Sequence, residues 1–206
     1  MQVVWPLRRA ASRTFRRCEE LPFAQKLLLA VGFAVLIGIT AQIRVPLPWT
    51  PVPITGQTFA LLLAGVLLGR SWGGFSAGFY LAVGAAGLPW FAGLSGGLAV
   101  LAGPTGGYLA GFVLAAMAVG YAVRTFAWAR TLTGLAVVML AANFVLIHGP
   151  GLVVLSLFTG VTEPIKLLGM GTIPFIPGDL TKALAAAMIA WPFLQPEPGA
   201  HAGRRA

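Results

Sequence analysis

The chain has 206 residues, of which 58% are hydrophobic and only 9% are charged, whereas soluble domains carry about 25% charged residues. This composition excludes an ordinary soluble domain and indicates a membrane protein that crosses the bilayer several times. The net charge of +9 does not indicate nucleic-acid binding, because the arginines form no stripe and lie between the apolar segments.

The apolar segments predict an all-α integral membrane protein with six transmembrane helices, since about 20 residues cross a bilayer. The predicted spans are residues 24–43, 55–68, 73–88, 105–123, 132–157 and 179–193. They form a six-helix membrane domain over 24–194, with a basic segment before it (1–23) and a short tail after it (195–206). The basic segment has no A-x-A cleavage site before the first apolar run, so we expect it to be retained.

The basic residues predict how the helices are oriented. Of the 14 lysines and arginines, all but Arg44, Lys166 and Lys182 fall on one side of a six-span topology. Cytoplasmic loops are enriched in Lys and Arg, so both termini are predicted to be cytoplasmic.

Three long segments lie on the opposite, outer side: 44–54, 89–104 and 158–178. The first contains four closely spaced prolines, which exclude a helix and predict a stiff extended segment. The other two are rich in glycine and apolar residues. Irregular backbone near a membrane is tolerated where it packs on protein or lines a cavity. We therefore predict that the three outer loops cap a ligand pocket.

The start of the last span carries two ionisable residues. Pro177 and Gly178 are expected to break the chain, after which Asp179 and Lys182 follow at positions i and i+3 on one helix face. Charged groups at membrane depth are costly and usually face a cavity or a partner. Two interpretations stay open at this point, a mutual ion pair that fixes the start of the helix and a functional site.

The sequence does not indicate catalysis. No serine has a nearby histidine signature, and the two histidines, His148 and His201, do not have metal-ligand spacing. There is no Walker loop for ATP hydrolysis either. We therefore predict a protein that is not an enzyme and uses no metal or cofactor, with His148 as a hydrogen-bonded core residue.

Binding of a small molecule fits the residues better, because such pockets combine an apolar lining with a few convergent polar groups. The candidate residues are Asp179, Lys182, Tyr108, Gln57, Trp90, Phe91, Ser95, Trp49 and Asn143. Each tryptophan is also typical of a membrane interface. The amide side chains of Gln57 and Asn143 are equally typical of hydrogen bonds between membrane helices.

Three motifs then carry a resemblance to a known family. Residues 51–59 (PVPITGQTF), 102–108 (AGPTGGY) and 177–182 (PGDLTK) together resemble the BioY family, the biotin-specific substrate-binding components of energy-coupling factor transporters. The similarity covers about residues 24–194. It implies high-affinity capture of biotin at the bacterial cytoplasmic membrane and docking on a transmembrane coupling subunit driven by two ATP-binding cassette ATPases. Some members are reported to work without these partners, and the sequence does not distinguish the two cases.

The resemblance assigns Asp179 and Lys182 to the ligand. A carboxylate accepts an N–H of the ureido ring, and an ammonium donates to a carbonyl or carboxylate. Which end of biotin each residue meets stays open. The resemblance also places Tyr108 and the 91–97 loop at the pocket, with Ser95 where some relatives carry an amide side chain.

Ala30 and Ala34, four residues apart in the first span, are similar to the small-xxx-small motif that such components present to the coupling subunit. Internal packing explains this motif equally well. Two alternatives for the function remain: capture of another vitamin on the same scaffold, and an intramembrane enzyme acting on a lipid or thioester.

Overall fold

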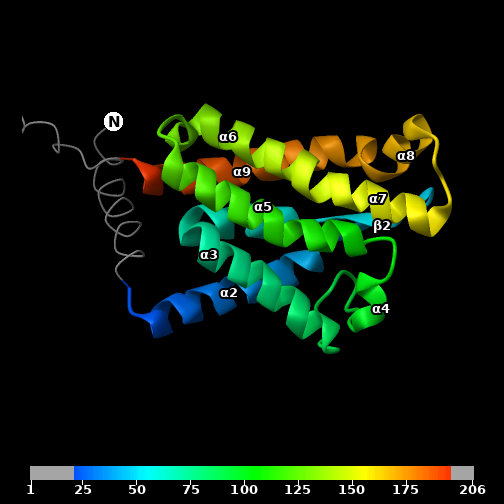
Figure 1. Ribbon diagram of the computed structural model, residues 1–206, viewed down its shortest axis with the longest axis horizontal. Helices are drawn as coiled ribbons and strands as arrows, with labels where there is room; N and C mark the ends of the chain where they lie inside the picture. Colours follow the sequence, from blue (N-terminus) through cyan, green and yellow to red (C-terminus); the bar gives the residue numbers. More distant parts are fainter. Residues whose placement is uncertain (1–20, 196–206) are drawn as a thin grey trace, which may run out of the picture.

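The structure, a computed structural model, describes residues 21–195 (Figure 1). The long helical elements are α2 (Phe23–Ala41), α3 (Gln57–Ala85), α5 (Gly106–Thr125), α6 (Leu132–Ala141), η2 (Ala142–Ile147), α7 (His148–Thr159) and α9 (Ile176–Leu194). The short elements are the strands β1 (Arg44–Leu47) and β2 (Thr50–Thr55) and the helices α4 (Leu98–Leu101), η1 (Trp128–Arg130), α8 (Pro164–Gly171) and η3 (Ile173–Phe175). Nearly all of the predicted N-terminal segment, 1–23, and of the tail, 195–206, lies outside the described residues.

Helix α3 is two helices joined by a sharp reversal at Gly69. The backbone there has φ 79° and ψ −175°, a conformation that glycine adopts and other residues almost never do. Gln57 Nε2 donates to Tyr80 Oη over 2.7 Å although the residues are 23 apart, a separation of about 35 Å along a continuous helix. The predicted spans 55–68 and 73–88 are therefore confirmed as an antiparallel pair.

Five helical stretches of the described chain are long and apolar enough to cross a membrane, and the reversal inside α3 makes six helical segments. This agrees with the predicted count. Helix α3 packs against α2, α5 and α9, and α5 packs in turn against α7. The start of α2 and the end of α9 lie at one end of the bundle, with α4 and α8 at the other (Figure 1).

The outer segments contain more regular structure than the sequence predicts. Residues 44–54 are extended, as predicted, but they pair as an antiparallel hairpin with Arg44 opposite Thr55. The ladder is irregular between Val45 and Leu47, where Pro46 has no N–H to donate. Residues 158–178 contain α8 and η3.

The predicted chain break at Pro177 and Gly178 is wrong. Helix α9 begins at Ile176, so both residues lie in its first turn. Proline is compatible with this position because the first N–H groups of a helix have no acceptor within the helix.

Ala30 and Ala34 do not form an exposed docking face. Both have no exposed surface, and the Ala30 carbonyl oxygen accepts a 2.8 Å hydrogen bond from Ser76 Oγ of α3. The small side chains therefore let α2 pack closely against α3. The burial of both residues favours internal packing, and their role in docking on a coupling subunit stays a prediction.

This packing predicts the effect of a larger side chain. Ala34→Leu should lower the free energy of unfolding by about 1–3 kcal/mol, because the added atoms enter a filled interface. Val35→Leu is the matched control, since Val35 is 44% exposed on the same helix. Thermal unfolding in detergent compares the two variants, and equal midpoints would contradict the tight contact between α2 and α3.

Candidate functional site

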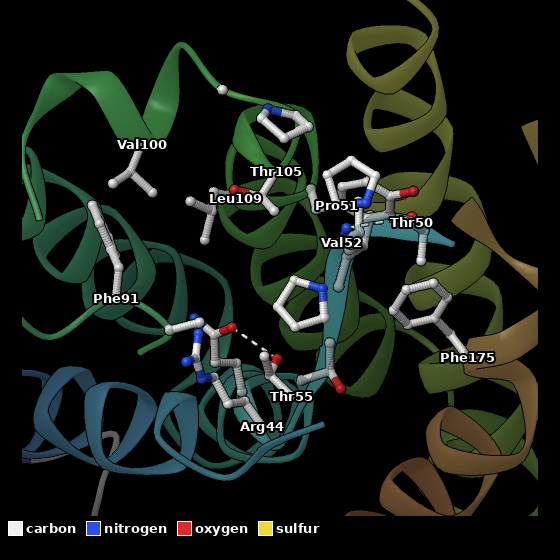
Figure 2. A pocket seen from close by; sticks show the side chains of 18 of the residues that line it. Arg44, Thr50, Pro51, Val52, Thr55, Phe91, Val100, Thr105, Leu109 and Phe175 are labelled. Carbon is white, nitrogen blue, oxygen red and sulfur yellow. Dashed lines mark hydrogen bonds between the residues drawn. The ribbon is translucent and has the colours of Figure 1, made fainter. Parts of the chain in front are cut away.

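A cavity of about 380 Å³ lies at the outer end of the bundle, within the usual range of about 300–1,000 Å³ for ligand pockets. The hairpin, the start of α3, the loop around α4, and helices α5, α7 and α9 all contribute to its wall. In Figure 2, Phe91 and Val100 stand across the cavity from Phe175, with Val52 of the hairpin and Leu109 of α5 between them. The outer segments thus cap a pocket, as predicted.

Asp179 is the centre of a buried polar cluster at one side of this cavity, and only 3% of its surface is exposed. Its Oδ1 lies 2.6 Å from Lys182 Nζ, one helical turn further along α9. Its Oδ2 accepts a 2.8 Å hydrogen bond from Asn143 Nδ2 and lies 2.9 Å from His148 Nε2. The ion pair proposed from the i, i+3 spacing is therefore present. It belongs to a larger network that also borders the cavity.

His148 connects Asp179 to the end of α8. Its Nε2 lies 2.9 Å from Asp179 Oδ2. Its Nδ1 lies 2.9 Å from the Gly171 carbonyl oxygen and 3.2 Å from the Thr172 hydroxyl. The imidazole therefore holds the carboxylate of α9 against the chain between α8 and η3.

A π-helical turn brings two of the partners of Asp179 together. The turn η2 covers Ala142–Ile147, between α6 and α7. Residues five apart in an α-helix point about 140° away from each other, so Asn143 and His148 would not face one atom. The wider π-helical turn, a feature frequently found at functional sites, lets both reach Asp179 Oδ2.

Lys182 also connects the last helix to the outer hairpin. Its Nζ donates to the Thr55 carbonyl oxygen over 2.8 Å, at the end of β2 and next to Gln57. Gln57 is buried, and its amide donates to Tyr80 Oη and accepts from the Thr55 hydroxyl. One wall of the cavity is therefore held in place by hydrogen bonds from α9 and α3.

Six of the nine predicted ligand residues line the cavity: Asp179, Lys182, Tyr108, Gln57, Phe91 and Ser95. Tyr108 presents its ring, because its hydroxyl already donates to the Gly171 carbonyl oxygen at 2.8 Å. Phe91 is 1% exposed and packs edge-on against Tyr80. The Ser95 hydroxyl donates to the Ala92 carbonyl oxygen, within the loop that bends at Gly93.

The other three predicted residues lie outside the lining. Trp49, at the tip of the hairpin, is 58% exposed. Trp90 turns away, with its indole N–H donating to the Tyr80 carbonyl oxygen at 2.9 Å and its ring against that of Tyr80. Asn143 contacts Asp179, so it supports the site without reaching the cavity.

Several polar lining residues are absent from the predicted set, among them His148, Arg44 and Thr58. His148 is a buried, hydrogen-bonded residue, as predicted, but it also touches both Asp179 and the cavity. Thr58 is 8% exposed, and its hydroxyl has no hydrogen-bond partner among residues 21–195. Thr58 follows directly after Gln57 in the 51–59 motif. This position is the sequence feature from which its place in the cavity could have been predicted.

The fold and the cavity define a class of protein, a helical membrane protein with a ligand-sized cavity at one end of its helix bundle. The chain belongs to the BioY family, whose sequence profile matches residues 10–196.

Curated relatives agree with this assignment. The chain is 49% identical over 141 residues to a probable biotin transporter BioY from Methanothermobacter thermautotrophicus, a match that covers 66% of this chain and 90% of the relative. It is 38% identical to the biotin transporter BioY of Thermotoga maritima, over 81% of this chain and 94% of the relative. Among solved structures, the biotin S-component of an ECF-type ABC transporter superposes with a TM-score of 0.73 at 27% identity. That match covers 82% of this chain and 89% of the other.

Proposed function

We propose that this protein captures biotin in the outer cavity and serves as the substrate-binding component of an energy-coupling factor transporter. The observation that carries the proposal is the buried Asp179 cluster beside a ligand-sized cavity, in a chain whose relatives are named biotin transporters. Membership of a transporter family does not support the alternative of an intramembrane enzyme.

The Asp179 carboxylate can accept a further hydrogen bond from a ligand. Oδ2 already has two partners, Asn143 and His148, whereas Oδ1 has one, Lys182. Each carboxylate oxygen accepts about two hydrogen bonds, so Oδ1 is free to accept an N–H of the ureido ring. Lys182 Nζ retains an N–H for the ureido carbonyl, and the unpaired Thr58 hydroxyl offers a further contact.

The apolar part of biotin matches the rest of the lining. The sulfur-containing ring and the aliphatic chain would pack against Phe91, Val52 and Phe175, which line the cavity. This contact would stabilise the complex, because it removes apolar surface of the ligand and of the cavity from water. The hairpin and the loop around α4 would exclude water from the bound ligand.

For transport, the ligand has to cross to the other side. We propose a multi-pass arrangement in the cytoplasmic membrane with both termini in the cytoplasm, supported by the distribution of basic residues. Partners would be a transmembrane coupling subunit and two ATP-binding cassette ATPases, as the ECF-type context of the structural relative suggests.

Uptake of radiolabelled biotin by a bacterial biotin auxotroph without its own transporter tests this function. Cells that express the protein with a coupling subunit and two ATPases should accumulate label, and cells that express Asp179→Asn should not. Expressing the protein without these subunits shows whether they are required. No uptake in either setting, by correctly inserted protein, would contradict a transport role.

Two aromatic residues provide a further prediction. Phe91→Ala should weaken biotin binding at least about tenfold, because it removes a buried wall of the cavity and leaves a void. Trp49→Ala, the matched control, should change affinity less than about twofold, since that side chain is exposed and away from the lining. Titration of both purified variants with biotin measures this, and a larger loss for Trp49→Ala would place the ligand elsewhere.

A further inference from the structure

Arg44 places an exposed basic side chain in the lining of the cavity. It begins β1 and lines the cavity, and in Figure 2 its side chain lies on the side of Phe91, across from Phe175. The guanidinium rests against the backbone at Gly93, where φ is +74° and any side chain would collide with it. The loop thus makes room for this cation.

Within the described residues, the basic side chains of the cavity lining differ in whether they have an acidic partner. Its ionisable lining residues are Asp179, Lys182, His148, Arg44 and Tyr108. Lys182 and His148 both contact Asp179. The Arg44 guanidinium has no hydrogen bond or ion pair within residues 21–195, so it is the cation of this lining that lacks a carboxylate partner in the described chain.

We propose that Arg44 binds the carboxylate of the ligand, so that the ureido ring enters first and the acid end stays at the rim. This inference rests on the proposed function and names the orientation of the substrate. A guanidinium matches a carboxylate with two parallel hydrogen bonds. At the exposed rim, the carboxylate keeps part of its hydration and avoids the desolvation cost of deep burial. The uncharged ring then occupies the buried end beside Asp179.

The test compares an acid with its neutral ester. Purified wild-type protein and Arg44→Gln are titrated with biotin and with biotin methyl ester. Arg44→Gln should bind biotin about tenfold more weakly, as expected when a charged hydrogen bond is lost, and should bind the ester within about twofold of wild type. Wild type itself should prefer the acid over the ester by the same factor.

Two further variants strengthen the test. Arg44→Lys should keep part of the preference for the acid, because it keeps the charge and loses the forked geometry. Arg44→Glu should reverse the preference, binding a biotin derivative that ends in a primary amine better than biotin itself.

Different results would contradict different parts of this proposal. An equal loss of both ligands in Arg44→Gln would show that Arg44 acts only by shaping the loop, and an unchanged affinity for biotin would place the carboxylate elsewhere. Loss of the acid preference in Lys182→Gln, but not in Arg44→Gln, would mean that the ligand lies the other way round. Failure of wild type to bind either ligand would overturn the proposed function itself.

Discussion

Replacing Asp179 with Asn should weaken biotin binding by at least about tenfold, or 1.4 kcal/mol. The amide keeps the shape of the carboxyl group but loses its charge, and it turns one acceptor into a donor. Oδ1 and Oδ2 together face Lys182, His148 and Asn143, so the amide leaves at least one of these donors facing another donor. The ureido ring also loses a charge-assisted acceptor. Titration with biotin in detergent measures the change.

The matched control for this variant is Glu163→Gln. Glu163 forms an i, i+3 pair with Lys166, as Asp179 does with Lys182, but both members of that pair are exposed. Exposed pairs contribute little, about 0–1 kcal/mol, so this variant should bind biotin like wild type. If correctly folded Asp179→Asn also bound like wild type, Asp179 would not be part of the ligand site.

Lys182→Met should produce the largest loss of stability. The side chain is only 16% exposed, and its removal leaves the buried Asp179 carboxylate without its cation and the Thr55 carbonyl without its donor. Breaking a buried pair from one side costs about 3–5 kcal/mol. The midpoint of thermal unfolding in detergent should therefore fall by several degrees.

The double variant Asp179→Asn, Lys182→Met distinguishes a coupled pair from two separate contributions. Once the carboxylate is neutral, the missing ammonium leaves no uncompensated charge. The double variant should therefore lose less stability than the sum of the single variants, by about 1–3 kcal/mol. Strict additivity would show that Asp179 and Lys182 do not interact in the folded protein.

Much of the fold could be predicted because its signals are local. Long apolar runs identify the helices, and Gly69 and Arg70 separate two of these runs where the chain reverses. The spacing of Asp179 and Lys182 was enough to place them on one helix face. Each of these features depends on residues a few positions apart.

The rest of the site depends on contacts that the sequence does not encode locally. Asn143 and His148 meet Asp179 because η2 is a π-helical turn. Gly149 and Pro150 signal an irregular helix at this point, but they do not show which side chains the irregularity brings together. Trp90 resembles a ligand-stacking residue, but the fold of its loop turns it toward Tyr80. No motif in the sequence marks Arg44 as a ligand residue. It becomes a candidate only because it lines the cavity in the folded protein.

Equilibrium binding of radiolabelled biotin to the purified protein in detergent, with thiamine and riboflavin as competitors, tests the central claim most directly. We expect tight binding of one biotin per protein that unlabelled biotin displaces and the other two vitamins do not. Displacement by thiamine or riboflavin, or the absence of biotin binding by a monodisperse sample, would contradict biotin as the substrate. In the second case the same cavity should be tested with other vitamins.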